Sequence, residues 1–189
     1  MALVKTVLLI DGENLTLRYQ DMVSQGRKPK SNVIHIPNIF VWHRGIFKLW
    51  ELDFFRILFY SSVVGDEDKI KQVEETISNQ IFDGQGILST SYFGKLQIVP
   101  WIFKKASKSY KSRLVDINIT IDSMRFAYTN AVDALCFISG DGDFLNLYAE
   151  IMRNGKKVSV AALSSGLSKS IKTGVDEFID LDTLLFEAP

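Results

Sequence analysis

One pattern occurs twice in the chain and restricts its fold more than any other feature. A short apolar, strand-like segment runs directly into an acidic turn, and a helical pattern follows the turn. The first copy comprises residues 4–10 and the turn DGEN, and the second comprises residues 134–138 and the turn SGDGD. Apolar runs of this length are typical of strands buried on both faces of a parallel sheet. The pattern therefore predicts parallel strands that are joined through helices.

The remaining segments continue this alternation of strands and helices. We predict further strands at residues 54–64, 96–103, 157–163 and 178–181. We predict helices at residues 15–22, 38–52, 66–82, 114–128 and 144–152, with a last turn and helix at 164–172. Residues 24–37 are interpreted as a loop inserted into the first crossover and residues 84–91 as a turn, and Pro100 predicts an edge position for its strand. The order predicts one α/β domain over residues 1–189, with a mainly parallel sheet between two helical layers.

The overall composition gives little indication of a partner. Lysine plus arginine and aspartate plus glutamate both number 22, so the formal net charge is zero and any affinity for nucleic acid requires a local basic patch. Cys136 is the single cysteine and lies in an apolar strand, which excludes a disulfide within the chain and a cysteine metal cage. No apolar run approaches the ~20 residues of a membrane-spanning helix, and the first residues do not resemble a signal peptide. We expect an intracellular, cytoplasmic protein without a membrane partner.

Acidic residues follow the predicted strands at one edge of the sheet. Asp11, Asp141 and Asp143 come just after strand ends, and Asp116 stands early in a helix that can begin at the same edge. Converging carboxylates raise one another's pKa values, and a divalent cation removes that cost. Oxygen ligands suit Mg²⁺ or Mn²⁺, and Asn14 adds an amide that can position a carboxylate, a water or a phosphate. We predict a metal centre of the four aspartates, with Asn14 beside them.

Each of these residues also has an ordinary structural interpretation. Asp11 and Asp141 are common turn residues, and Asp143 is a suitable N-cap for the helix that follows it. Asp122 lies six positions after Asp116, on another face of an ideal helix, where it can be a solvated residue. The metal hypothesis depends on the coincidence of acids at separate crossovers.

A metal held by carboxylates can activate a water and stabilise charge on a phosphoryl group, as in nucleases and polymerases. The sequence contains no Ser-His-Asp or Cys-His arrangement and no P-loop. A phosphohydrolase of small esters, acting through an aspartyl phosphate, is disfavoured because Glu13 replaces the second aspartate of the expected Asp-x-Asp pattern.

Four blocks of the chain resemble a known family. The blocks VLLIDGEN, LVDINITIDSM, ALCFISGDGDF and GKKVSVAAL resemble the NYN domain, the LabA-like branch of the PIN-like ribonuclease superfamily, over residues 7–181. The resemblance implies a PIN-like three-layer α/β/α sandwich and a Mg²⁺- or Mn²⁺-dependent endoribonuclease. It places the metal-binding acids at Asp11, Asp116, Asp141 and Asp143 and the polar position of the first block at Asn14. It also matches Asp122 to the second acid of the middle block, and we assign supporting roles to Asp122 and Ser139.

The chain departs from the family pattern in two places. Arg113 stands where a lysine is common, three residues before the middle aspartate, and residues 24–37 are longer than a minimal crossover. Relatives of this fold can also serve as binding or regulatory modules. The alternative hypothesis is therefore a catalytically weak NYN module that binds RNA or a protein partner.

A basic segment before the Asp116 helix is the candidate RNA contact. We predict that single-stranded RNA contacts five residues: Arg18, Lys108, Tyr110, Lys111 and Arg113. Tyr110 can stack on a base, and Lys104 and Lys105 belong to the same basic segment. Arg18 can form the other bank of the track together with Arg27, Lys28 and Lys30. The alternative is a solvated loop with ordinary charges. The RNA target, the mode of cleavage, the choice between the two ions, and binding to a second copy or another protein stay open.

Overall fold

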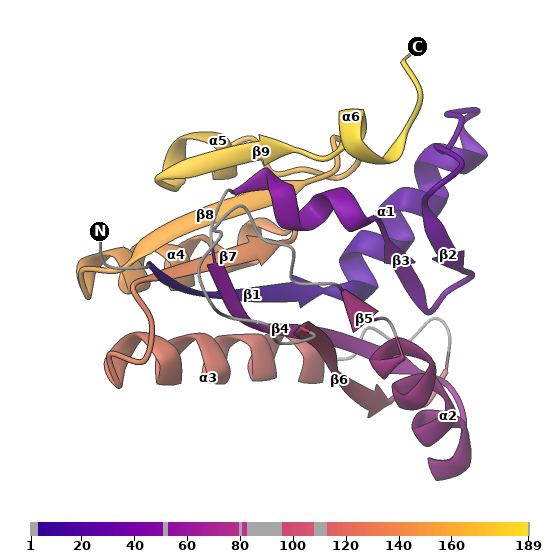
Figure 1. Cartoon of the computed structure of the whole chain (residues 1–189), viewed down its shortest axis with the longest axis horizontal. Coiled ribbons are helices and arrows are strands. Elements are labelled where there is room, and N and C mark those ends of the chain that lie inside the picture. Colours follow the sequence, from indigo (N-terminus) through magenta and orange to yellow (C-terminus); the bar gives the residue numbers. More distant parts are fainter. Residues whose placement is uncertain (1–3, 51–52, 80, 83–95, 108–112, 189) are drawn as a thin grey trace.

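The computed structural model of the chain describes residues 4–50, 53–79, 81–82, 96–107 and 113–188 (Figure 1). Its centre is a sheet of seven strands in the order β5-β6-β4-β1-β7-β8-β9. The strands are β1 (Lys5–Asp11), β4 (Asp53–Val63), β5 (Ile81–Phe82), β6 (Leu96–Lys104), β7 (Ala134–Ile138), β8 (Lys157–Ala162) and β9 (Glu177–Asp180). All neighbours pair in parallel except β5, which is antiparallel to β6. The predicted, mainly parallel sheet is confirmed.

Helices connect the strands and cover both faces of the sheet. They are α1 (Gly12–Ser24), α2 (Glu67–Ser78), α3 (Leu114–Tyr128), α4 (Leu145–Arg153), α5 (Ile171–Gly174) and α6 (Asp182–Leu185). Two 3₁₀ helices, η1 (Arg44–Leu49) and η2 (Gly142–Phe144), and a hairpin of β2 (Ile34–Ile36) and β3 (Phe40–Trp42) complete the described elements. Asn154-Gly155 ends α4 with Gly155 in the left-handed region (φ 75°), as a helix C-terminal glycine often is.

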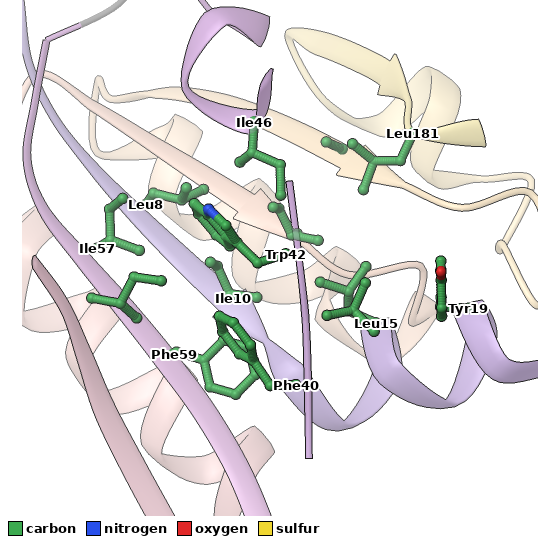
Figure 2. Packing of buried hydrophobic residues seen from close by; sticks show 14 of the residues in the cluster. Leu8, Ile10, Leu15, Tyr19, Phe40, Trp42, Ile46, Ile57, Phe59 and Leu181 are labelled. Atoms are coloured by element: carbon green, nitrogen blue, oxygen red, sulfur yellow. The ribbon is translucent and has the colours of Figure 1, made fainter. Parts of the chain in front are cut away.

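Alternate residues of β1 supply two separate cores. Leu8 and Ile10 pack with α1, α2, η1 and the β2–β3 hairpin on one face. Val7 and Leu9 pack with α3 and α4 on the other face. This follows from the period of two along a strand, which points successive side chains to opposite sides. The predicted three-layer α/β/α sandwich is confirmed, and Figure 2 shows part of the first core.

The helix predicted at residues 38–52 is wrong. In its place the chain forms the turn of the β2–β3 hairpin, then strand β3, then the short helix η1. Asn38 adopts φ 60°, which a right-handed helix does not allow, and three successive residues, Phe40, Val41 and Trp42, are all buried. Phe40 and Trp42 belong to the core and reach it from the hairpin laid over the sheet (Figure 2), and Trp50 reaches it from the end of η1.

The predictions for the connecting segments and for Pro100 differ in how well they agree with the structure. The loop predicted at residues 24–37 contains strand β2, and the helix predicted at residues 66–82 ends at Ser78 and is followed by β5. The edge position predicted for the strand of Pro100 holds only in part, because β6 lies between β4 and β5. Strand β5 pairs only with residues 96–97 of β6, so among the described strands the segment around Pro100 has β4 as its one neighbour. The turn predicted at residues 84–91 lies outside the described residues.

Candidate functional site

Asp11 is the centre of the polar residues at the carboxyl edge of the sheet. It ends β1 and is the N-cap of α1, where its Oδ1 accepts a hydrogen bond from the backbone N–H of Asn14 at 2.9 Å. Its Oδ2 accepts from the Ser139 hydroxyl at 3.1 Å. Ser139 follows β7, the neighbour of β1, so this bond joins the two predicted acidic turns across the sheet. Ser139 therefore orients the Asp11 carboxylate.

Further hydrogen bonds continue from this pair into the second turn. Asn14 Oδ1 accepts from the Gly140 N–H at 3.2 Å, and Ser139 Oγ accepts from the Asp141 N–H at 3.2 Å. Asp141 Oδ1 accepts from the Asp143 N–H at 3.0 Å, so Asp141 is the N-cap of η2. The capping role considered for Asp143 belongs to Asp141 in this structure, and Asp143 is exposed.

The electrostatic environment of Asp11 differs from that of an ordinary carboxylate. The residue is 4% exposed, and its pKa is raised to about 7, with burial as the largest cause. The negative charges of Asp116 and Asp141 also contribute to the raised pKa, while the hydrogen bonds from Asn14 and Ser139 partly offset it. Asp116 lies on the first turn of α3. The fold therefore brings Asp116 and Asp141 close enough to Asp11 for their charges to raise its pKa.

Tyr148 is a residue of this region that the sequence analysis missed. It lies on α4 and is fully buried, and its hydroxyl has no hydrogen-bond partner among the described residues. Burial raises the pKa of the phenol, and the charges of Asp11 and Asp141 raise it further. An aromatic residue in an amphipathic helix gives no sequence signal beyond that of a core residue. Its nearness to two acids becomes visible only in the fold.

Glu13 is a second residue whose role the sequence did not reveal. Its Oε1 lies 2.7 Å from Lys105 Nζ, and its Oε2 accepts from the Ser62 hydroxyl at 2.7 Å. The Lys105 and Glu13 side chains are only 14% and 19% exposed, so this ion pair is largely shielded from water. Lys105 is thereby held by a carboxylate at the sheet edge, so its charge in the predicted basic track is largely balanced by Glu13.

Comparison with known proteins decides the family. The sequence model of the NYN domain matches residues 5–182. The chain belongs to the NYN domain family. The LabA-like branch stays a prediction. No curated protein matches this NYN domain.

A solved structure agrees with the fold. This is the crystal structure of a protein of unknown function from Vibrio parahaemolyticus, with a TM-score of 0.63 and 18% identity, which covers 97% of this chain and 96% of that chain. At this identity the likeness supports the architecture alone. The NYN domain therefore has a nuclease-like, PIN-like α/β fold. In the part of the chain that the structure describes, every helix is too short or too polar to span a bilayer.

Asp122 connects two elements of the NYN domain. It accepts a hydrogen bond from the Tyr60 hydroxyl at 2.8 Å and forms an ion pair with Arg125 at 2.8 Å. Burial, together with this hydrogen bond and the nearby carboxylate charge, raises the pKa of Tyr60. The hydrogen bond from Tyr60 fastens α3 to β4, so Asp122 supports the helix that carries Asp116.

The predicted basic track is only partly described. Arg113 is exposed just before α3, and half-buried Arg18 packs against Gly166, where a Cβ would overlap its guanidinium. Arg27 forms an ion pair with Asp182, and Lys30 donates to a backbone carbonyl of α6, so both anchor the inserted segment. Three predicted RNA contacts lie outside the described residues: Lys108, Tyr110 and Lys111.

The predicted metal centre fits this edge by its chemistry. The acids there are carboxylates that repel one another, and the Tyr148 hydroxyl, which has no partner within the described ranges, is a further oxygen close to two of them. Hard cations such as Mg²⁺ and Mn²⁺ prefer such oxygen ligands. Among the described residues, however, no three acidic, histidine or cysteine side chains are close enough together to form a ready ligand set. The assignment of Asp11, Asp116, Asp141 and Asp143 as ligands stays a prediction.

Proposed function

We propose that this NYN domain is a metal-dependent ribonuclease that hydrolyses phosphodiester bonds of single-stranded RNA. The observation that carries the proposal is the buried Asp11 carboxylate, whose pKa is raised to about 7 at an edge that it shares with Asp116 and Asp141. Perturbed carboxylates of this kind are concentrated at functional sites. When bound, Mg²⁺ or Mn²⁺ supplies a Lewis acid and an activated water. Asp11, Asp116, Asp141 and Asp143 would hold the ion.

The residues around Asp11 have distinct roles in this proposal. Ser139 and the Asn14 N–H fix the direction of the Asp11 carboxylate through their two hydrogen bonds. Asp11 must lose its proton to act as a ligand, and its raised pKa places that loss near neutral pH. The amide oxygen of Asn14 accepts a hydrogen bond from the Gly140 N–H. This bond holds the Asn14 side chain at the sheet edge, and the NH₂ group of Asn14 can donate to a phosphate oxygen there. The Glu13–Lys105 pair keeps a cation at the same edge.

A second function is favoured by one specific observation. No three potential ligands come together among the described residues. A catalytically weak NYN module that binds RNA or a protein partner needs no such cluster. The two functions differ in whether RNA is cleaved, and they can be separated directly.

The test is cleavage of labelled single-stranded RNA by the purified protein with Mn²⁺, Mg²⁺ or EDTA. Asp11→Asn and Asp141→Asn serve as site variants, and Asp68→Asn, at an exposed position on the first turn of α2, is the matched control. We expect metal-dependent cleavage by the parent and by the control, and a loss of roughly 100-fold or more in each folded site variant, as for loss of a group acting in the transition state. Circular dichroism checks that the variants are folded.

Other outcomes would change the conclusion. RNA binding without cleavage by the parent would favour the binding module. Cleavage that persists in both site variants would reject the acidic centre. Hydrolysis of p-nitrophenyl phosphate but not of RNA would indicate a phosphohydrolase of small esters.

A further inference from the structure

A surface hollow of about 240 Å³ lies between α3 and the turn of η2. We call it the α3–η2 hollow, and its lining consists of Asp116, Ile117, Thr120, Ile121, Asp143 and Phe144. Pockets for drug-sized ligands measure roughly 300–1,000 Å³. The α3–η2 hollow is smaller, and its volume suits a single ring system. It shares Asp116 and Asp143 with the predicted metal centre, so a ligand at the acids and a ligand in the hollow would be neighbours.

The walls of the hollow are apolar and open to solvent. Ile117 and Ile121 are each 48% exposed and lie one helical turn apart, and Phe144 beneath them is 3% exposed. Leu114, one turn before Ile117, is 45% exposed and extends the apolar surface of α3. Single exposed apolar residues are common, but three on one helix beside a hollow form a contact surface. Flat aliphatic surfaces of this kind can pack against the face of a planar ring.

The polar groups of the hollow are all hydrogen-bond acceptors. The carboxylates of Asp116 and Asp143 can only accept when ionised. The Thr120 hydroxyl donates its proton to the Asp116 carbonyl at 2.8 Å, so it presents lone pairs to a ligand. A ring with exocyclic amino groups can donate hydrogen bonds to these acceptors, as cytosine, adenine and guanine do. Uracil offers one donor, N3–H, between two carbonyl oxygens, and its O4 would face these acceptors where cytosine presents an amino group.

We propose that the α3–η2 hollow binds an unpaired RNA base next to the phosphate at the acidic edge, and that it selects amino-bearing bases over uracil. The position relative to the phosphate rests on the proposed ribonuclease function. The selectivity rests on the acceptor-only lining. The isoleucine walls hold the ring, and the acids read its amino group.

The test measures binding separately from cleavage. Fluorescence anisotropy is recorded with end-labelled oligomers of cytidine, of uridine and of N4,N4-dimethylcytidine, which keeps the cytosine ring without its amino donors. Ca²⁺ replaces Mg²⁺, and gels check that the oligomers stay intact. The proteins are the parent, Ile117→Ala/Ile121→Ala, and Leu17→Ala, a 52% exposed leucine on α1, which packs on the opposite face of the sheet.

We expect the parent to bind oligocytidine about tenfold more tightly than the other two oligomers, the equivalent of one good base contact. The double isoleucine variant should lose this preference, and Leu17→Ala should keep it. Equal affinity of the parent for cytidine and uridine would overturn the proposal, and so would a preference unchanged in the double variant. Light scattering is the check for a second copy of the chain in the hollow. A dimer of the parent that the double variant breaks, while its RNA affinity is unchanged, would also overturn the proposal.

The same samples keep this proposal distinct from the ribonuclease proposal. A cytidine preference that depends on the isoleucines, without Mg²⁺- or Mn²⁺-dependent cleavage by the parent, would support the base site and reject the nuclease. Cleavage with no base preference in binding would support the nuclease and reject the base site.

Discussion

At the scale of single residues, Asp11 shows how the fold makes an ordinary turn aspartate unusual. Its two hydrogen bonds favour the charged form, yet burial and two neighbouring acids outweigh them and raise its pKa to about 7. The folded protein therefore holds a proton between about pH 4 and pH 7 that the unfolded chain has lost. Stability from this group is therefore fully present below about pH 4, decreases as the pH rises from about 4 to about 7, and levels off above that.

Asp11→Asn should remove this pH dependence. We expect the variant to be more stable than the parent at pH 8 by ~2–4 kcal/mol and nearly equal to it at pH 4, because a shift of about three pKa units corresponds to ~4 kcal/mol. Urea unfolding at several pH values without metal measures the difference. Addition of Mn²⁺ at pH 8 should raise the melting temperature of the parent more than that of the variant. A variant that is less stable than the parent at pH 8 would contradict the raised pKa.

Tyr148 offers a second prediction at this scale. Its buried hydroxyl lacks a partner among the described residues, so Tyr148→Phe should raise the free energy of unfolding by ~1 kcal/mol. If the hydroxyl faces a ligand at the acids, the same variant should lower kcat about tenfold with little change in KM. Unfolding curves and RNA cleavage rates measure the two effects. A stable variant with full activity would make Tyr148 a core residue only.

At the scale of elements, the turn between β1 and α1 depends on a close approach. A Cβ on Gly12 would overlap the ring of Phe59 on β4. Gly12→Ala should therefore destabilise the domain by ~1–3 kcal/mol, the usual cost of overpacking a core. Phe59→Leu in the same chain should recover part of that loss. Gly140→Ala is the control, because its Cβ would make only ordinary contacts of 3.4 Å or more. Equal losses in both glycine variants would contradict the argument.

The sequence predicted elements well where hydrophobic period and turn residues agreed. The β1, β7 and β8 strands, α3 and the parallel order follow from apolar runs that end in polar turns. The β2–β3 hairpin was missed because the spacing of its apolar residues also fits a helix. Only tertiary packing over the sheet distinguishes the two.

The part of the site that could be predicted from the sequence consists of residues that come directly after strands. Asp11 and Asp141 come together through Ser139 because β1 and β7 are neighbours in the sheet. The pairing of Glu13 with Lys105 joins residues 92 positions apart, and no local pattern reports it. Chain topology, rather than residue type, determines such contacts.

At the scale of the whole molecule, zero net charge means that RNA must be attracted by a local surface. Each phosphate contact with single-stranded nucleic acid changes the slope of log K against log salt concentration by about −0.7. Four predicted cations, Arg18, Lys108, Lys111 and Arg113, therefore imply a slope of roughly −3.

The Lys108→Gln/Lys111→Gln variant should reduce this slope by about 1.4, whereas exposed Lys71→Gln on α2 should leave it unchanged. Anisotropy titrations from 50 to 300 mM KCl, roughly the range over which such contacts weaken, provide the slopes. A reduced slope in the double variant alone would place the basic segment on the RNA. Equal reductions in both variants would mean that charge acts without a local track. A slope near zero in the parent would mean that affinity comes from base contacts, which would leave the α3–η2 hollow as the main source of binding energy.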